Sequence, residues 1–135
     1  MKQLLAGLLI ILIIGCTSTT DELTELIITL RANSIAVELN GLIVPEFINM
    51  SGQLLLVNNE VVQAYVFSNE SSATMFASSI VGDGSYVNGI AVNWISRPHF
   101  YQHGKLIVIQ LGNDEVVAAG IQLYTGPQFA GLGLE

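Results

Sequence analysis

Two histidines, His99 and His103, are the first candidates for chemistry, because only three residues separate them. This H-x-x-x-H spacing binds zinc when both rings lie one turn apart on a helix. Pro98 before the pair and Gly104 after it argue against a helix, and in an extended strand residues four apart lie about 13 Å from each other. Only a tight bend could bring both rings to one metal. We therefore expect no metal site and no cofactor, with His99 packed or hydrogen-bonded and His103 exposed in a turn.

Hydroxyl nucleophiles are the second candidates, since Ser85 and Ser96 could meet His99 in the folded chain. Catalysis by serine needs a base within hydrogen-bonding distance and a third group that orients this base. The sequence contains no G-x-S-x-G turn, and most of its acidic pairs fall at predicted helix starts, where capping and the helix dipole explain them. We expect that the protein is not an enzyme.

The residues with the character of a binding surface lie between positions 94 and 101. Trp, Tyr and Arg are frequent at the energetic centres of interfaces, so we predict a contact surface formed by Trp94, Arg97, His99, Phe100 and Tyr101. In the alternative interpretation Trp94 and Phe100 are core residues, and the tyrosines rim that core. An exposed flat patch would favour a protein partner, whereas a concave apolar pocket with a few polar groups would favour a small ligand.

A chemical signal of another kind lies at the N-terminus. Lys2 precedes an apolar run over residues 4–14, which is shorter than the roughly 20 residues that span a bilayer as a helix. Gly15 and Cys16, the only cysteine, follow the run directly. These residues resemble a bacterial lipobox, and the resemblance implies cleavage before Cys16, lipid on its thiol and acylation of the new amino terminus. The alternative is an ordinary signal peptide or short anchor with an incidental cysteine.

This N-terminus predicts the organisation of the chain: a lipoprotein signal peptide over 1–15, lipidated Cys16 with a tether to residue 20, and one globular domain over 21–135. Two or more acyl chains, such as palmitate, hold a protein stably on a membrane. We expect an extracytoplasmic protein anchored in the cell membrane or the outer membrane. Without Lys2 the chain has three basic residues against eleven acidic ones, a formal charge of −8. This charge argues against nucleic acid as a partner.

The first elements that position these residues follow from hydrophobic spacing. Apolar residues recur at helical spacing and predict a helix over about 20–32, with Thr19 as its cap. Asn40-Gly41 predicts a tight hairpin turn between strands over 35–39 and 42–44. Phe47 is expected to point inward from the loop that follows.

Further strands are expected over 53–57, 61–67, 90–96 and 105–111, and further helices are expected after a cap at Ser68 or Asn69 and a cap at Asn113. Shifting the chain by 44 residues lays 62–80 on 106–124, so two strand-strand-helix units could follow the first helix. Either a duplication or the ordinary recurrence of strand, cap and helix explains this pattern. We predict an α+β fold with an antiparallel sheet of about five to six strands and helices mainly on one face.

Four short motifs carry a family resemblance. They are N-W-I at 93–95, P-H-F-Y at 98–101, G-K-L-I-V at 104–108 and G-P-Q-F-A-G at 126–131. With W-x-x-x-P-H-F-Y and G-P-Q-F-A-G together, the chain resembles a group of uncharacterised bacterial lipoprotein domains over about two-thirds of its mature length. It departs from that group at Asn59, where the group tends to have Gly, and at His103. The resemblance implies a lipoprotein and brings no activity with it.

The sequence thus predicts a lipid-anchored binding or interaction module at the membrane surface, with the membrane and an unidentified protein as its partners. The alternative is an accessory domain that binds a small ligand in a pocket between sheet and helices.

Overall fold

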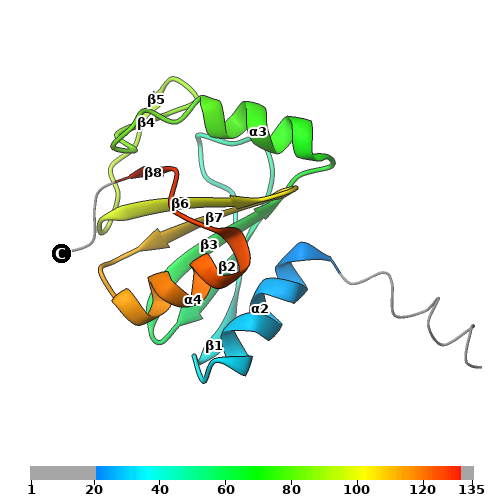
Figure 1. The fold of residues 1–135 in the computed structure, drawn as a ribbon. Helices are drawn as coiled ribbons and strands as arrows, with labels where there is room; N and C mark the ends of the chain where they lie inside the picture. Colours follow the sequence, from blue (N-terminus) through cyan, green and yellow to red (C-terminus); the bar gives the residue numbers. More distant parts are fainter. Residues whose placement is uncertain (1–20, 132–135) are drawn as a thin grey trace, which may run out of the picture.

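The computed structural model describes residues 21–131, in which helices and strands follow each other as drawn in Figure 1. The helices are α2 (Glu22–Ala32), α3 (Glu70–Ser78) and α4 (Glu115–Thr125). The strands are β1 (Val37–Ile43), β2 (Gly52–Val57), β3 (Glu60–Val66), β4 (Tyr86–Val87), β5 (Ile90–Ala91), β6 (Pro98–His103), β7 (Leu106–Leu111) and β8 (Ala130–Gly131). The predicted signal peptide, Cys16 and the tether lie outside the described residues.

Six of these strands form one sheet in the order β1-β2-β3-β7-β6-β8, and all neighbours in it are antiparallel. β3 and β7 occupy its centre, where Val61 pairs with Leu111 and Val66 pairs with Leu106. β4 and β5 pair separately as a two-stranded ribbon. The α+β fold with an antiparallel sheet behind an N-terminal helix is therefore confirmed.

The sheet separates two cores, because side chains along a strand alternate between its faces. α2 and α4 pack against each other on one face, called here the closed face, and α3 lies on the other, called here the open face (Figure 1). The closed-face core is mainly aliphatic and includes Leu26, Leu30, Leu55, Val62, Leu106, Val108, Val117 and Ile121. The open-face core is rich in aromatic residues and includes Phe47, Tyr65, Phe76, Phe100, Ile107 and Ile109. Two of the three described helices share a face, as predicted.

Two strand-strand-helix units are present, β2-β3-α3 and β6-β7-α4. β3 and β7 are antiparallel neighbours, so a two-fold rotation about an axis perpendicular to the sheet superimposes the β2-β3 hairpin on the β6-β7 hairpin. This rotation does not exchange the two faces of the sheet. A duplicated unit would therefore put both helices on one face. α3 and α4 cover opposite faces, so the two units are similar in order only.

The Asn40-Gly41 dipeptide does not form a hairpin turn, which corrects the prediction of two strands over 35–44. Both residues lie inside β1, and the pairing with β2 shifts between Leu39 and Leu42. Leu39 pairs with Leu55 and Leu42 pairs with Gln53, so β1 carries one extra residue there. Gly41 has φ +84°. A β-bulge uses the same positive-φ conformation as a tight turn, which is why the sequence signal was ambiguous.

Three further predictions need correction. The strand expected over 90–96 is reduced to Ile90–Ala91, because the ribbon ends there, and the chain re-enters the sheet only at Pro98. The cap of α4 is Asp114 and not the predicted Asn113. The Asp114 carboxylate accepts hydrogen bonds from the N–H groups of Val116 and Val117. The cap of α2 is Asp21, which accepts from Thr24. The predicted cap Thr19 lies outside the described residues.

Candidate functional site

Trp94 and Phe100, two residues of the predicted contact surface, belong to the open-face core. The Trp94 ring lies 5.4 Å from the ring of Phe47 and 5.7 Å from that of Phe100, measured between centroids. Its indole N–H donates to the carbonyl oxygen of Gly84 at 2.7 Å. Phe100 is fully buried and Trp94 is partly buried. Here the structure matches the interpretation of this pair as core residues.

His99 and Tyr101 point to the closed face and are fully buried. The Nδ1 atom of His99 lies 3.1 Å from Oε1 of Gln128, and its Nε2 is buried with no hydrogen-bond partner. Arg97 is partly buried, and its carbonyl oxygen accepts from the N–H of Gly112. Trp94 and Phe100 therefore lie on one side of the sheet and His99 and Tyr101 on the other, so the five predicted residues do not form one exposed surface.

His103 is exposed at the end of β6, with its ring 4.3 Å from the ring of Tyr124. Among the described residues, no group of three or more His, Cys, Asp or Glu side chains is close enough to hold a metal ion.

A buried polar network runs between β6, β7 and β3 on the closed face. The Tyr101 hydroxyl donates to Gln110 at 2.7 Å, and the Gln110 amide donates to Glu60 at 2.7 Å. The second oxygen of Glu60 accepts from the N–H of Asp114 at the start of α4. Burial raises the pKa of Tyr101 to about 12. This network joins the sheet to α4. Its polar side chains form hydrogen bonds with one another and with the backbone N–H of Asp114.

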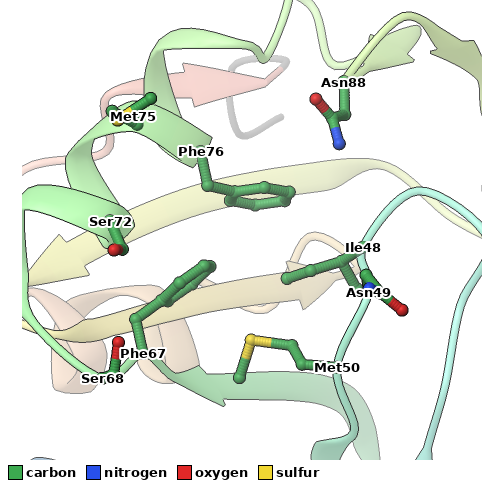
Figure 2. Close-up of a pocket in the computed structure, with 9 residues that line it drawn as sticks. All are labelled: Ile48, Asn49, Met50, Phe67, Ser68, Ser72, Met75, Phe76 and Asn88. Carbon is green, nitrogen blue, oxygen red and sulfur yellow. The ribbon is translucent and has the colours of Figure 1, made fainter.

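An open cavity lies on the open face, between α3 and the segment 44–51 that links β1 to β2. Its volume is about 560 Å³. Figure 2 shows that side chains from three parts of the chain converge on it. The walls are formed by Ile48, Asn49, Met50, Phe67, Ser68, Ser72, Met75, Phe76 and Asn88.

The local structure explains the placement of these walls. Asn69 caps α3 by accepting from the N–H of Ser72, so the helix turns back over the sheet directly after β3. This turn sets the ring of Phe67 5.5 Å from that of Phe76. The amide of Asn88 lies 3.4 Å from the carbonyl oxygen of Phe47 and ties the loop after α3 to the opposite wall.

The chemistry of the pocket is apolar with a neutral polar rim. Phe67, Phe76, Ile48 and Met50 supply the apolar surface, and hydroxyl and amide side chains stand around it. None of the nine lining residues is charged. Such a site can enclose a ring or a short chain and hydrogen-bond to one or two neutral groups.

A second apolar cavity of about 330 Å³ lies on the same face and includes Trp94, Phe47, Val61 and Leu111 in its walls. The Phe47 ring stacks against Phe76 of the first pocket with centroids 6.4 Å apart and therefore stands between the two cavities. Of the predicted surface, only Trp94 lines a cavity described here.

Sequence reasoning placed Phe47 inside the protein but did not predict a pocket beside it. No spacing motif joins Met50, Phe67 and Asn88. The pairing of β2 with β3 brings Met50 near Phe67, and the hydrogen bond to Phe47 holds Asn88 at the pocket.

Comparison of the chain with protein-family models, with curated proteins and with solved structures found no match. The resemblance to bacterial lipoprotein domains stays a prediction. Within residues 21–131 no helix is long and apolar enough to cross a membrane.

Proposed function

We propose that this protein is a lipid-anchored, extracytoplasmic, non-enzymatic domain that binds a small uncharged molecule in the pocket between α3 and the segment 44–51. The observation that carries the proposal is the pocket itself, which encloses about 560 Å³ between aromatic, thioether and amide side chains. Sites for small ligands have volumes of about 300–1,000 Å³ and mostly apolar walls with few polar groups.

The walls also favour a class of ligand. The uncharged lining offers no counter-ion, and burying an unpaired charge is costly. Phe67 and Phe76 present aromatic surface, while methionine adapts its shape to irregular ligands. We infer a ligand with an apolar ring or chain and one or two neutral hydrogen-bonding groups.

An interaction with a protein is the second candidate, and the edge strand β1 favours it. Leu39 is 58% and Leu42 72% exposed on this strand, and Val44 beyond it is 71% exposed. An unpaired strand edge with exposed apolar side chains can accept an added strand from another chain. The large negative charge makes nucleic acid an unfavourable partner for either role.

Ser72→Phe tests the ligand site, because Ser72 lines the pocket and a phenyl ring there would fill it. The adjacent Ser71→Phe makes the same change at an exposed position of α3 and is the matched control. With the neutral fluorescent probe N-phenyl-1-naphthylamine, we expect the unchanged protein and Ser71→Phe to bind. Ser72→Phe should weaken binding at least tenfold.

Circular dichroism shows first that both variants fold. Equal probe affinity in the two folded variants would overturn the site, as would an unchanged protein that does not bind the probe or any neutral aromatic in a small-molecule screen by ligand-observed NMR.

A further inference from the structure

Helix α4 is apolar on its outer side as well as on the side that packs against the sheet. Val117, Ala118, Gly120 and Ile121 are buried, yet Val116 is 59% and Leu123 66% exposed. Ala119 is exposed between them. Val116, Ala119 and Leu123 follow each other at helical spacing and are called here the outer stripe. A helix that is apolar all round is normally covered on every side.

An apolar groove extends the outer stripe toward α2. It has a volume of about 380 Å³, and the outer stripe lines it together with Asn33, Ile35, Glu115 and Gly120. Close packing of the two helices produces this shape, because Gly120 has no side chain and lies against Leu30 and Ile35. Glu115, at the first turn, is the one charged residue within α4.

The far end of the outer stripe lies beside the start of α2. The Tyr124 hydroxyl, next to Leu123, donates to the Glu25 carboxylate at 2.8 Å. Glu25 follows Asp21, the first described residue, by about one helical turn. Leu123 is therefore near the point at which the chain enters the described domain.

The length of chain before this point limits its distance from a membrane. Only residues 17–20 separate Cys16 from Asp21. Five extended steps span at most roughly 17 Å. If Cys16 carries lipid in a bilayer, the Leu123 end of α4 is held close to the bilayer surface, whereas α3 lies on the opposite face of the sheet (Figure 1).

We propose that the outer stripe of α4 lies against the lipid bilayer, with Leu123 inserted at the boundary between headgroups and acyl chains. This inference rests on the lipid anchor of the proposed function and names the surface that the anchor brings to the membrane. An amphipathic surface bound in this way buries apolar side chains to a depth of about 5–10 Å.

The acidic residues near the anchor are engaged within the protein. Asp21 accepts from the Thr24 N–H, and Glu22 accepts from the N–H groups of Lys105 and Leu106. Glu25 accepts from Tyr124. The contact therefore depends on apolar side chains and not on attraction to anionic headgroups, so on a neutral lipid surface salt should leave it unchanged.

A single thiol can measure this contact. Cys16 is the only cysteine, so in the acylated chain an introduced cysteine is the only free thiol. We would place a nitroxide on Leu123→Cys and, as matched control, on Met75→Cys, since Met75 is 71% exposed on α3. Each full-length chain is processed in a bacterial host and reconstituted into vesicles of phosphatidylcholine, which carry no net charge. The collision rates of each nitroxide with oxygen and with a water-soluble nickel chelate are then compared.

At position 123 the ratio of oxygen to nickel collisions should be at least fivefold higher than at position 75, in low and in high salt. Equal ratios in an acylated chain would overturn the docking surface and leave the anchor intact. Mass spectrometry of the N-terminal peptide shows whether Cys16 carries lipid, and so distinguishes failure of the docking surface from failure of the anchor. An unmodified or unprocessed Cys16 would overturn the anchor and this inference together, while the ligand pocket would still be tested by its own probe.

Discussion

The two faces of the sheet are covered by different elements and by different kinds of side chain. On the closed face, α2 and α4 cover the strands with branched aliphatic side chains, and most members of that core are fully buried. On the open face, one helix of nine residues and several loops do the covering, and large rings span the distances between them. The pocket beside α3 and the cavity beside Trp94 lie on the open face, with Phe47 between them.

This difference shows how cavities arise in a small domain. Two helices packed side by side interdigitate over the whole face of a sheet, whereas a single short helix leaves the sides of that face to loops. Rings packed at tilted or perpendicular angles, such as Trp94 on Phe100 at 77°, leave irregular gaps between them. The cavities of the open face thus have aromatic walls, whereas the groove beside α4 lies on the outside of the closed-face helices and has none.

Truncation of one side chain on each face should give the largest difference. Leu106→Ala removes a fully buried side chain of the closed face, and we expect the free energy of unfolding to fall by about 3 kcal/mol. Met50→Ala shortens a partly buried wall of the open pocket and should lower it by only about 1 kcal/mol, because water already reaches the site. Urea denaturation measures both, and equal losses would contradict the distinction between the faces.

The buried glutamines offer a smaller contrast. Gln110→Leu removes the acceptor of Tyr101 and the donor to Glu60, so we expect a loss of about 2 kcal/mol in unfolding free energy. Gln63→Leu on the open face removes only the acceptor of the Tyr65 hydroxyl and should lower it by about 1 kcal/mol. Urea denaturation of the two variants under the same conditions measures both losses in the free energy of unfolding. A larger loss for Gln63→Leu than for Gln110→Leu would contradict the prediction.

Alkaline pH should give the smallest effect. Burial raises the pKa of Tyr101 to about 12, so the folded state holds its proton more tightly than the unfolded state, where the pKa is about 10. The contribution of protonated Tyr101 to the free energy of unfolding is complete below pH 10 and is lost as pH rises toward 12. From pH 9 to pH 11 this group should lower the free energy of unfolding by about 1 kcal/mol.

Denaturation of Tyr101→Phe at both pH values should show a smaller decrease than the unchanged protein. Tyr86→Phe, at a 50% exposed position, is the control. Identical pH dependence in all three proteins would show that Tyr101 does not contribute.

Local signals predicted most of the elements. The cap at Asn69 and the strand now bounded as Leu106–Leu111 depend on neighbours within a few residues. Asn40-Gly41 was ambiguous because a turn and a bulge share the same backbone conformation. The residues before Pro98 have strand-like composition but no partner strand in the sheet, which composition cannot reveal.

The candidate site was much less predictable than the fold. The segment from Trp94 to Tyr101 carries the right residue types for a surface, but strand β6 sends alternate side chains to opposite faces and buries them. The pocket depends on distances between Met50, Phe67 and Asn88, which lie in three separate segments. Only the folded chain brings these three segments together.

The central pairing of β3 with β7 also has a consequence for the time at which the protein can fold. Residues 61–66 must find residues 106–111, so neither core is complete until the last quarter of the chain is available. Contacts between such distant segments slow folding, because a long loop must close first. In the lipid-anchored protein that we propose, a chain that emerges from a membrane N-terminus first would remain unfolded until β7 has passed through, and Cys16 would reach the bilayer before the fold exists.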